Sequence, residues 1–231
     1  MRRTTFALVH GAGSDSWYWH LVAPELRGRG HDVVAPDLPC DDDTAGLDAY
    51  TDAVVESVGE RDDVVLVAQS FAGFTAPLVC ERVPVRRLVL LNAMVPYPGE
   101  APGEWWDATA WHGRPLETEQ DFRDVFFHDV PPPLAAEAMQ KGRPQSGTPF
   151  EKPWPAGAWP SVPTTALVAR DDRFFSAAFQ RRVLRERLGI VPDEIDGGHL
   201  VALSRPVELA GRLDSYADAL PGPAPSFTDS R

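Results

Sequence analysis

Short apolar runs alternate along this chain with longer segments in which apolar residues recur every three or four positions. The runs are typical of buried strands, and the longer segments are typical of helices that pack on one side. Alternation of strand and helix is typical of a parallel sheet with helices on both faces. We therefore expect an α/β protein with a mostly parallel central sheet. The pattern predicts strands at 4–9, 31–35, 64–69, 87–91, 164–169 and 191–195, and helices at 17–26, 47–58, 75–81, 177–188 and 206–219.

The alternation is interrupted between residues 96 and 163 by a proline-rich segment that shows only short helical patterns, near 122–127 and 134–139. Ligands of open α/β sheets bind at the carboxyl ends of the strands, so an insertion leaving from that edge would cover the site as a cap. Its aromatic residues could line an apolar substrate cavity or form the cap's own core, and both readings stay open. The segment holds five of the seven tryptophans: Trp105, Trp106, Trp111, Trp154 and Trp159.

Length and composition set the domain organisation. We expect a core at 1–95 and 164–220, a cap insertion at 96–163, and a tail at 221–231 whose polar, proline-rich sequence predicts disorder. The net charge of −12 argues against a nucleic-acid partner. No apolar run reaches the roughly 18 residues of a membrane span. An excess of exposed aromatic residues on the cap would favour a homodimer.

The start of the chain and the two cysteines indicate the cellular compartment. Met1 to Arg3 lead directly into a strand, without the apolar core or cleavage site of a signal peptide. Cys40 lies in an acidic loop and Cys80 in a helix, so two free thiols in a reducing compartment are expected. We therefore predict a soluble, cytoplasmic protein.

The most informative stretch runs from Val64 to Gly73. An apolar, β-branched run reaches a single serine, Ser70, with the small residues Ala68 and Ala72 two positions away on either side, and then continues as a helix. A buried strand that turns sharply into a helix at a serine is a nucleophile elbow, which exposes the hydroxyl at the end of the sheet. Gly73 would let the helix pack close to the strand. The alternative is that Ser70 only caps the helix.

A nucleophilic serine needs a base, usually a histidine that is oriented by a carboxylate. In the elbow architecture the order along the chain is serine, acid, histidine, with the last two after successive strands. Asp171 and Asp172 follow the strand at 164–169, and His199 lies in a glycine-containing loop after the last strand. We predict Ser70, Asp172 and His199 as catalytic residues. Asp172 is preferred because the residues after it lead directly into a helix, whereas Asp171 would bond loop amides.

The oxyanion of a tetrahedral intermediate needs two preorganised donors. We assign one to the backbone amide of Phe71 and the other to Ala12, in the glycine-rich turn at 10–13 after the first strand. That turn could also indicate dinucleotide binding, but the full glycine fingerprint is missing. His10 is interpreted as shaping the loop. We expect substrate contacts from three cap residues, Trp106, Phe126 and His128. For His128 a surface position is the alternative.

Four motifs of the chain carry a family resemblance. They are Val9-His10-Gly11-Ala12 with Trp17-Tyr18-Trp19, Gln69-Ser70-Phe71-Ala72-Gly73, Asp172-Arg173-Phe174-Phe175 and, most specific of all, Gly198-His199-Leu200-Val201-Ala202-Leu203-Ser204-Arg205-Pro206. Together they resemble the α/β-hydrolase superfamily over nearly the whole chain, and within it the plant methylesterase and hydroxynitrile lyase branch and its bacterial relatives. The resemblance implies the same Ser-Asp-His triad and oxyanion donors, a small helical cap, and no metal or organic cofactor.

Two positions separate the activities of this branch. Hydroxynitrile lyases typically carry a threonine just after the first-strand histidine and a lysine just after the catalytic histidine. This chain has Gly11 and Leu200 there. Without a hydroxyl and an ammonium to manage a leaving cyanide, ester hydrolysis is favoured. The alanines at the elbow, where glycine is commoner, are a sterically mild departure.

Three functions remain open, since fold does not fix function. The leading hypothesis is a serine hydrolase that cleaves a carboxylic ester of a small, uncharged, fairly apolar substrate through an acyl-enzyme. The second uses the same triad for a lyase, lactonase or tailoring reaction in small-molecule metabolism. The third is a ligand-binding protein that keeps the triad as a pocket lining.

Overall fold

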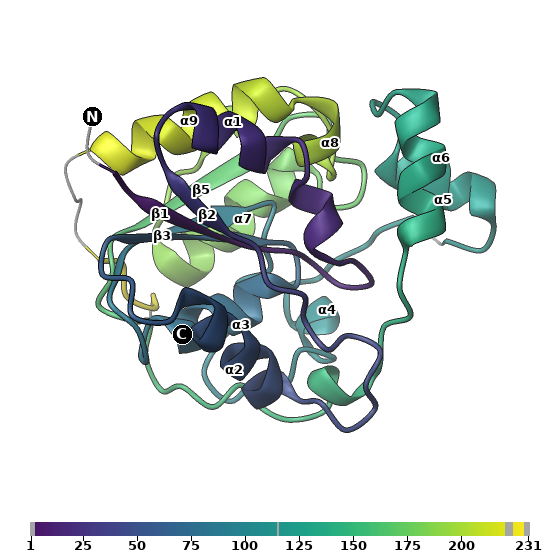
Figure 1. Cartoon of the computed structure of the whole chain (residues 1–231). Coiled ribbons are helices and arrows are strands. Elements are labelled where there is room, and N and C mark those ends of the chain that lie inside the picture. Colours follow the sequence, from purple (N-terminus) through teal and green to yellow (C-terminus); the bar gives the residue numbers. More distant parts are fainter. Residues whose placement is uncertain (1–2, 115, 220–223, 229–231) are drawn as a thin grey trace.

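The computed structural model describes residues 3–114, 116–219 and 224–228. In these residues a six-stranded sheet of order β2-β1-β3-β4-β5-β6 forms the centre of the chain, and every neighbouring pair is parallel (Figure 1). The predicted α/β architecture with a mostly parallel sheet is confirmed. The strands are β1 (Thr5–Val9), β2 (Asp32–Val34), β3 (Val64–Gln69), β4 (Val85–Leu91), β5 (Thr164–Ala169) and β6 (Asp193–Ile195).

Helices cover both faces of the sheet, because the side chains of each strand alternate between two apolar layers. One layer contains η1 (Ser16–Trp19), α1 (Val22–Gly28), α8 (Val201–Ser204) and α9 (Pro206–Asp218), and the other contains α2 (Leu47–Val58), α3 (Ala72–Val79) and α7 (Ala177–Leu188). In the first layer α1 packs against α9, and in the second α2 packs against α3.

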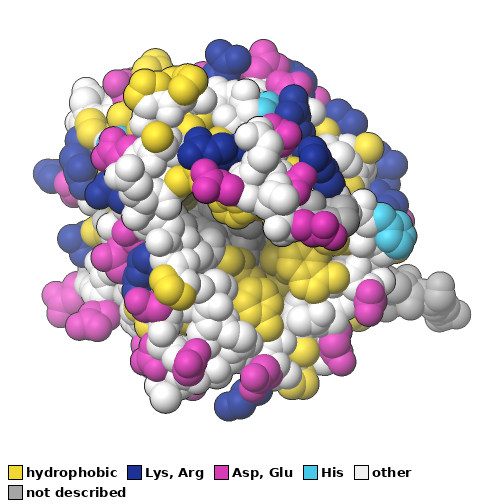
Figure 2. Space-filling model, turned by 90° about the vertical axis from the view of Figure 1, so that its right-hand side faces the viewer, with side chains coloured by type: hydrophobic (Ala, Val, Ile, Leu, Met, Phe, Trp, Pro, Cys, Tyr) yellow, Lys and Arg dark blue, Asp and Glu magenta, His cyan; other side chains and the backbone are white. Residues whose placement is uncertain are grey.

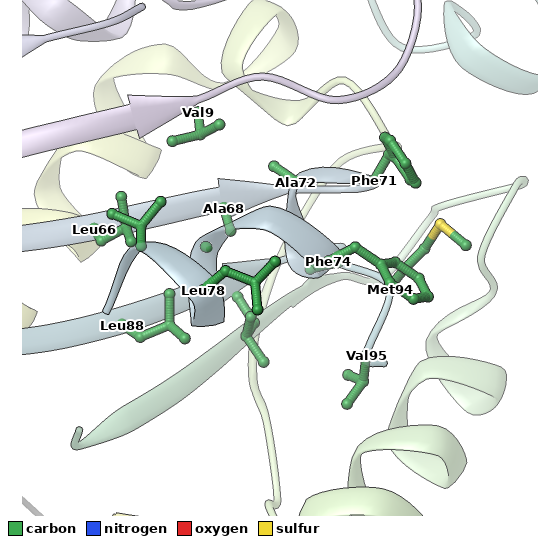
Figure 3. Close-up of a cluster of buried hydrophobic side chains, with 14 of the residues drawn as sticks. Val9, Leu66, Ala68, Phe71, Ala72, Phe74, Leu78, Leu88, Met94 and Val95 are labelled. Atoms are coloured by element: carbon green, nitrogen blue, oxygen red, sulfur yellow. The ribbon is translucent and has the colours of Figure 1, made fainter. Parts of the chain in front are cut away.

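Two helix predictions need correction. The helix expected at 17–26 is two elements, η1 and α1. A continuous helix would place Pro24 in its interior, where the ring clashes with the carbonyl of His20 and no amide is available to bond it. The helix expected at 75–81 is α3, which begins at Ala72, directly after the elbow. Figure 3 shows Leu78 of this helix in the buried layer near Leu66 of β3 and Leu88 of β4, and Phe74 next to Met94.

The segment at 96–163 contains α4 (Trp105–Ala108), α5 (Glu119–Phe126), α6 (Pro132–Lys141) and η2 (Thr148–Phe150). Only α5 and α6 stand apart from the layered core, at the right of Figure 1. Trp105, Trp154 and Trp159 are buried in the same layer as α2 and α3. The indole N–H of Trp105 donates to the Val95 carbonyl, at 2.9 Å. These three tryptophans therefore anchor the segment to the core of the sheet.

Of the tail expected to be disordered, the structure describes residues 224–228. Phe227 lies against three aromatic rings of the core, those of Tyr97, Trp154 and Trp159, with centroid distances of 5.2–5.9 Å. The Thr228 amide donates to the Arg187 carbonyl at 3.0 Å. Residues 221–223 and 229–231 lie outside the described residues. Within the described ranges, no helix combines the length and apolar character needed to cross a bilayer.

Candidate active site

Ser70 lies at the turn between β3 and α3, and its backbone is strained. Its φ of +53° is in the left-handed region, which non-glycine residues rarely adopt. Three backbone hydrogen bonds hold this conformation. The Ser70 amide donates to Leu91, and the Ser70 carbonyl accepts from Gly73 at 3.1 Å and from Met94 at 2.9 Å. Such strain persists only where the surroundings enforce it, and it is concentrated at functional sites.

The small residues around the elbow lie in tightly packed surroundings. Ala68 and Ala72 are fully buried. A Cβ at Gly73 would lie 1.8 Å from the Met94 carbonyl oxygen, far inside van der Waals contact. Gly73 therefore permits a close approach, as predicted, but the neighbouring backbone is the segment after β4 and not β3.

His199 and Asp172 are joined by a buried hydrogen bond of 2.7 Å between Nδ1 and Oδ2. The other oxygen of Asp172 accepts from the backbone amides of Phe174 and Phe175, each at 2.8 Å. Because a carboxylate only accepts, His199 Nδ1 carries a proton, and in the neutral imidazole Nε2 is then the acceptor. Asp171 instead exchanges hydrogen bonds with the backbone of Gly197. The structure thus brings Asp172, not Asp171, to His199.

Two buried polar residues that the sequence pattern does not identify support this pair. Asn92, at the end of β4 with φ +45°, donates to the His199 carbonyl at 3.2 Å and accepts from the Ala169 amide at 2.7 Å. Gln180 on α7 donates to the Phe175 carbonyl at 3.0 Å and lies 3.4 Å from Asp172. Two features of the sequence could have indicated them: Asn92 is a polar residue directly after a buried strand, and Gln180 is an amide on the inner face of α7.

A cavity of about 520 Å³ opens beside these residues, and both Ser70 and His199 line it. Figure 2 shows hydrophobic side chains gathered in a hollow on the face that carries α5 and α6. Phe126 and Phe174 lie edge-on to His199, with centroids 5.4 and 5.3 Å away. The aromatic lining consists of Trp17, Tyr18, Phe71, Trp106, Phe122, Phe126, Phe127, Phe150 and Phe174.

The cap residues expected to contact substrate divide into two groups. Trp106 and Phe126 line the cavity. His128 does not line the cavity, and its side chain is mostly buried, so it occupies neither the cavity wall nor an open surface position. The chain turns after α5, and this turn directs the imidazole toward the backbone of Gly198, where an added Cβ would lie 2.7 Å from His128 Nε2.

The glycine-rich turn after β1 borders the cavity and is held from both sides. His10 is buried, and its Nε2 accepts from the Leu38 amide at 3.1 Å while Nδ1 donates to the Gly11 carbonyl at 2.8 Å. Burial lowers the pKa of His10, which keeps the ring neutral in this arrangement. From the cap segment, Gln145 accepts from the Gly13 amide at 3.0 Å. His10 therefore shapes this turn, as the sequence predicted.

Ala12 and Phe71 line the same cavity, and the amides of both residues are the predicted oxyanion donors. Neither donates a hydrogen bond to another residue in the described part of the chain. Both residues lie in turns, and their amides are the candidates for the two donors that an oxyanion needs.

Residues 6–212 match the alpha/beta hydrolase family, and the chain belongs to it. It is similar to methylesterase 8 of Arabidopsis thaliana, with 26% identity over 94% of this chain and 91% of the relative. It is also similar to a pyrethroid hydrolase of Sphingobium wenxiniae, with 28% identity over 95% of this chain and 89% of the relative. The crystal structure of polyneuridine aldehyde esterase shares the fold, with a TM-score of 0.78 and 22% identity over 94% and 100% of the two chains. The predicted resemblance to the plant methylesterases and their bacterial relatives is confirmed.

Proposed function

We propose that this protein is a serine esterase that cleaves a carboxylic ester of an uncharged, fairly apolar small molecule. The observation that carries the proposal is the buried bond between His199 and Asp172 at the wall of a cavity that also contains Ser70 on its strained elbow. Family membership and the esterases among the similar proteins support the same reaction class.

In the proposed reaction His199 Nε2 takes the proton from Ser70 as its oxygen attacks the ester carbonyl. Asp172 holds the imidazole in the required tautomer and stabilises its charged form. The amides of Ala12 and Phe71 donate to the oxyanion. His199 then protonates the leaving alcohol. A water activated by the same imidazole releases the acid from Ser70 and regenerates the enzyme.

The lining of the cavity supports an apolar substrate. Its volume lies within the range of roughly 300–1,000 Å³ that is typical of small-molecule sites. The charged lining residues already have partners: Asp15 accepts from the Trp17 amide, Arg143 pairs with Asp41, and Lys141 lies over the Trp17 ring. An uncharged ester therefore fits better than an ionised one.

The main alternative is a lyase or tailoring reaction on the same triad. A Cβ at Gly11 would lie 2.4 Å from the Gln69 side-chain oxygen and 2.9 Å from the Ser70 Cβ. The threonine of the hydroxynitrile lyases does not fit here unless Gln69 moves. Position 200 carries Leu200, so the lysine that follows the catalytic histidine in the hydroxynitrile lyases is replaced by an apolar side chain that lines the cavity. Both positions therefore favour hydrolysis.

The test is labelling by a fluorophosphonate probe, followed by turnover of p-nitrophenyl esters, with wild type and Ser70→Ala compared. We expect labelling and turnover in the wild type and neither in Ser70→Ala. Asp172→Asn should lower kcat by about 10⁴-fold, because the imidazole then takes the wrong tautomer. A folded wild type that neither labels nor turns over esters, yet melts higher when apolar esters are added, would support a binding protein instead.

We also propose a cytoplasmic location. Cys40 and Cys80 are both free thiols, which supports a reducing compartment.

A further inference from the structure

Asp129 lies in the turn between α5 and α6, the two cap helices that stand apart from the core. Its Oδ2 accepts a hydrogen bond of 2.7 Å from the backbone amide of Gly198, which directly precedes His199. The two partners are 69 residues apart in sequence. A carboxylate of the cap therefore holds the backbone that carries the proposed catalytic base.

The loop is shaped to receive this carboxylate. A Cβ at Gly198 would lie 2.7 Å from Asp129 Oδ1, so only glycine permits the approach. Gly197 has a φ of +120°, which side-chain-bearing residues rarely adopt, and a Cβ there would lie 3.1 Å from Asp129 Oδ2. The two glycines before His199 thus serve a contact with the cap as well as a local turn.

The placement of Asp129 is costly for a side chain with a purely structural role. The side chain is 14% exposed, and Oδ1 is buried without a hydrogen-bond partner among the described residues. The nearest cationic candidate is His128, whose Nε2 lies 4.0 Å away. A buried carboxylate is unfavourable unless its charge or its acceptor oxygens are used. Here the used oxygen is the one that bonds Gly198.

We infer that Asp129 is a positioning residue for His199. Its bond to Gly198 fixes the backbone of the histidine loop on the cap side, while Asn92 fixes the His199 carbonyl on the core side. The orientation of the imidazole then depends on where the cap lies. This inference rests on the proposed role of His199 as the base. A misplacement of about 1 Å at a reacting group can lower the rate roughly 100-fold.

The test compares Asp129→Leu, which removes the acceptor at similar size, with Asp129→Asn, which keeps an acceptor oxygen for Gly198. We expect Asp129→Leu to lower kcat for a p-nitrophenyl ester roughly 10- to 100-fold, with KM within about twofold of wild type. Asp129→Asn should return kcat to within about threefold. The rate of fluorophosphonate labelling should follow kcat. The control is Asp124→Leu, the same change at a partly exposed position of α5, where the side chain is 42% exposed; it should keep wild-type kinetics.

If Asp129→Leu does not fold, Asp129→Ala replaces it in the same comparison. A folded variant without the acceptor that keeps kcat within twofold overturns the inference, even if its melting temperature falls. Equal losses in Asp129→Asn and Asp129→Leu also overturn it, because the acceptor oxygen would then not matter. Wild-type protein without labelling or turnover overturns the esterase proposal itself, and Ser70→Ala in parallel keeps the two failures distinct.

Discussion

Gly73→Ala is a one-carbon change whose effect can be worked out from the elbow. The new Cβ would lie 1.8 Å from the Met94 carbonyl oxygen and 2.9 Å from its carbonyl carbon. Real Cβ contacts stay beyond about 3.0 Å, so the α3 and Met94 backbones must separate by about 1.2 Å. The atoms in the way belong to the main chain, and they cannot rotate aside as a side chain can.

The separation has two costs. Overpacking of a close-packed core costs about 1–3 kcal/mol. The shift also stretches the 2.9 Å bond from the Met94 amide to the Ser70 carbonyl, and the net loss of such a bond is about 1 kcal/mol. We therefore expect Gly73→Ala to lower the free energy of unfolding by roughly 2–4 kcal/mol. Because Met94 and Ser70 both line the cavity, kcat should fall at least about tenfold.

Urea unfolding followed by tryptophan fluorescence, with ester turnover on the same samples, measures both effects. Gly28→Ala is the matched control, since nothing lies within 4 Å of a Cβ placed there, at the end of α1. The control should leave stability unchanged or raise it by up to about 1 kcal/mol, because alanine is the better helix former. If Gly73→Ala unfolds within about 0.5 kcal/mol of wild type and keeps its kcat, the close approach of α3 to Met94 is not what requires glycine.

Two further predictions concern buried ionisable groups. Burial lowers the pKa of His10 in the folded protein. As the pH falls below about 6.5, the unfolded chain therefore takes up a proton at this histidine while the folded chain does not. The contribution of His10 to the free energy of unfolding is thus complete above that pH and is lost on acidification. His10→Gln should remove up to about 1.4 kcal/mol per pH unit of this slope in urea titrations at pH 5–7, whereas His112→Gln, at an exposed position, should leave the slope unchanged. The guanidinium of Arg187 is buried 2.6 Å from the carboxylate of Glu100. Glu100→Ala removes that carboxylate and leaves the guanidinium buried without it, so it should lower the free energy of unfolding by about 3–5 kcal/mol in thermal and urea unfolding. Asp52→Ala, which breaks an exposed ion pair, should cost less than about 1 kcal/mol, and an equal loss in both variants would contradict the assigned difference in burial.

The strands and the elbow could be predicted from sequence because their signals are local. An apolar run of five to seven residues is long enough to define a buried strand, and a serine between small residues marks the turn after β3. Asp172 and His199 could be placed because the carboxyl ends of parallel strands meet at one edge of the sheet. The break before α1 was also readable in principle, since Pro24 cannot continue a helix from η1.

The contacts of the segment at 96–163 could not be predicted in this way. These contacts join residues that are far apart in sequence, and no periodic pattern of apolar residues predicts such contacts. Trp105 and Trp106 are neighbours, yet the first is buried in the core and the second borders the cavity. His128 faces Gly198 because the chain turns between α5 and α6, and no local pattern states the direction of that turn.

Local patterns in the chain are enough to predict the sheet, its strands in their order along the chain, and the residues at the carboxyl ends of those strands. Those features depend on hydrophobic periodicity and on the fact that residues in a short turn stay close to the end of the strand before it. The fold is needed to show which side chains of the segment at 96–163 line the cavity, and that Asp129 accepts a hydrogen bond from Gly198 in the loop of His199. Such contacts depend on how separately formed elements pack, and packing is set by the shapes of all the neighbours at once.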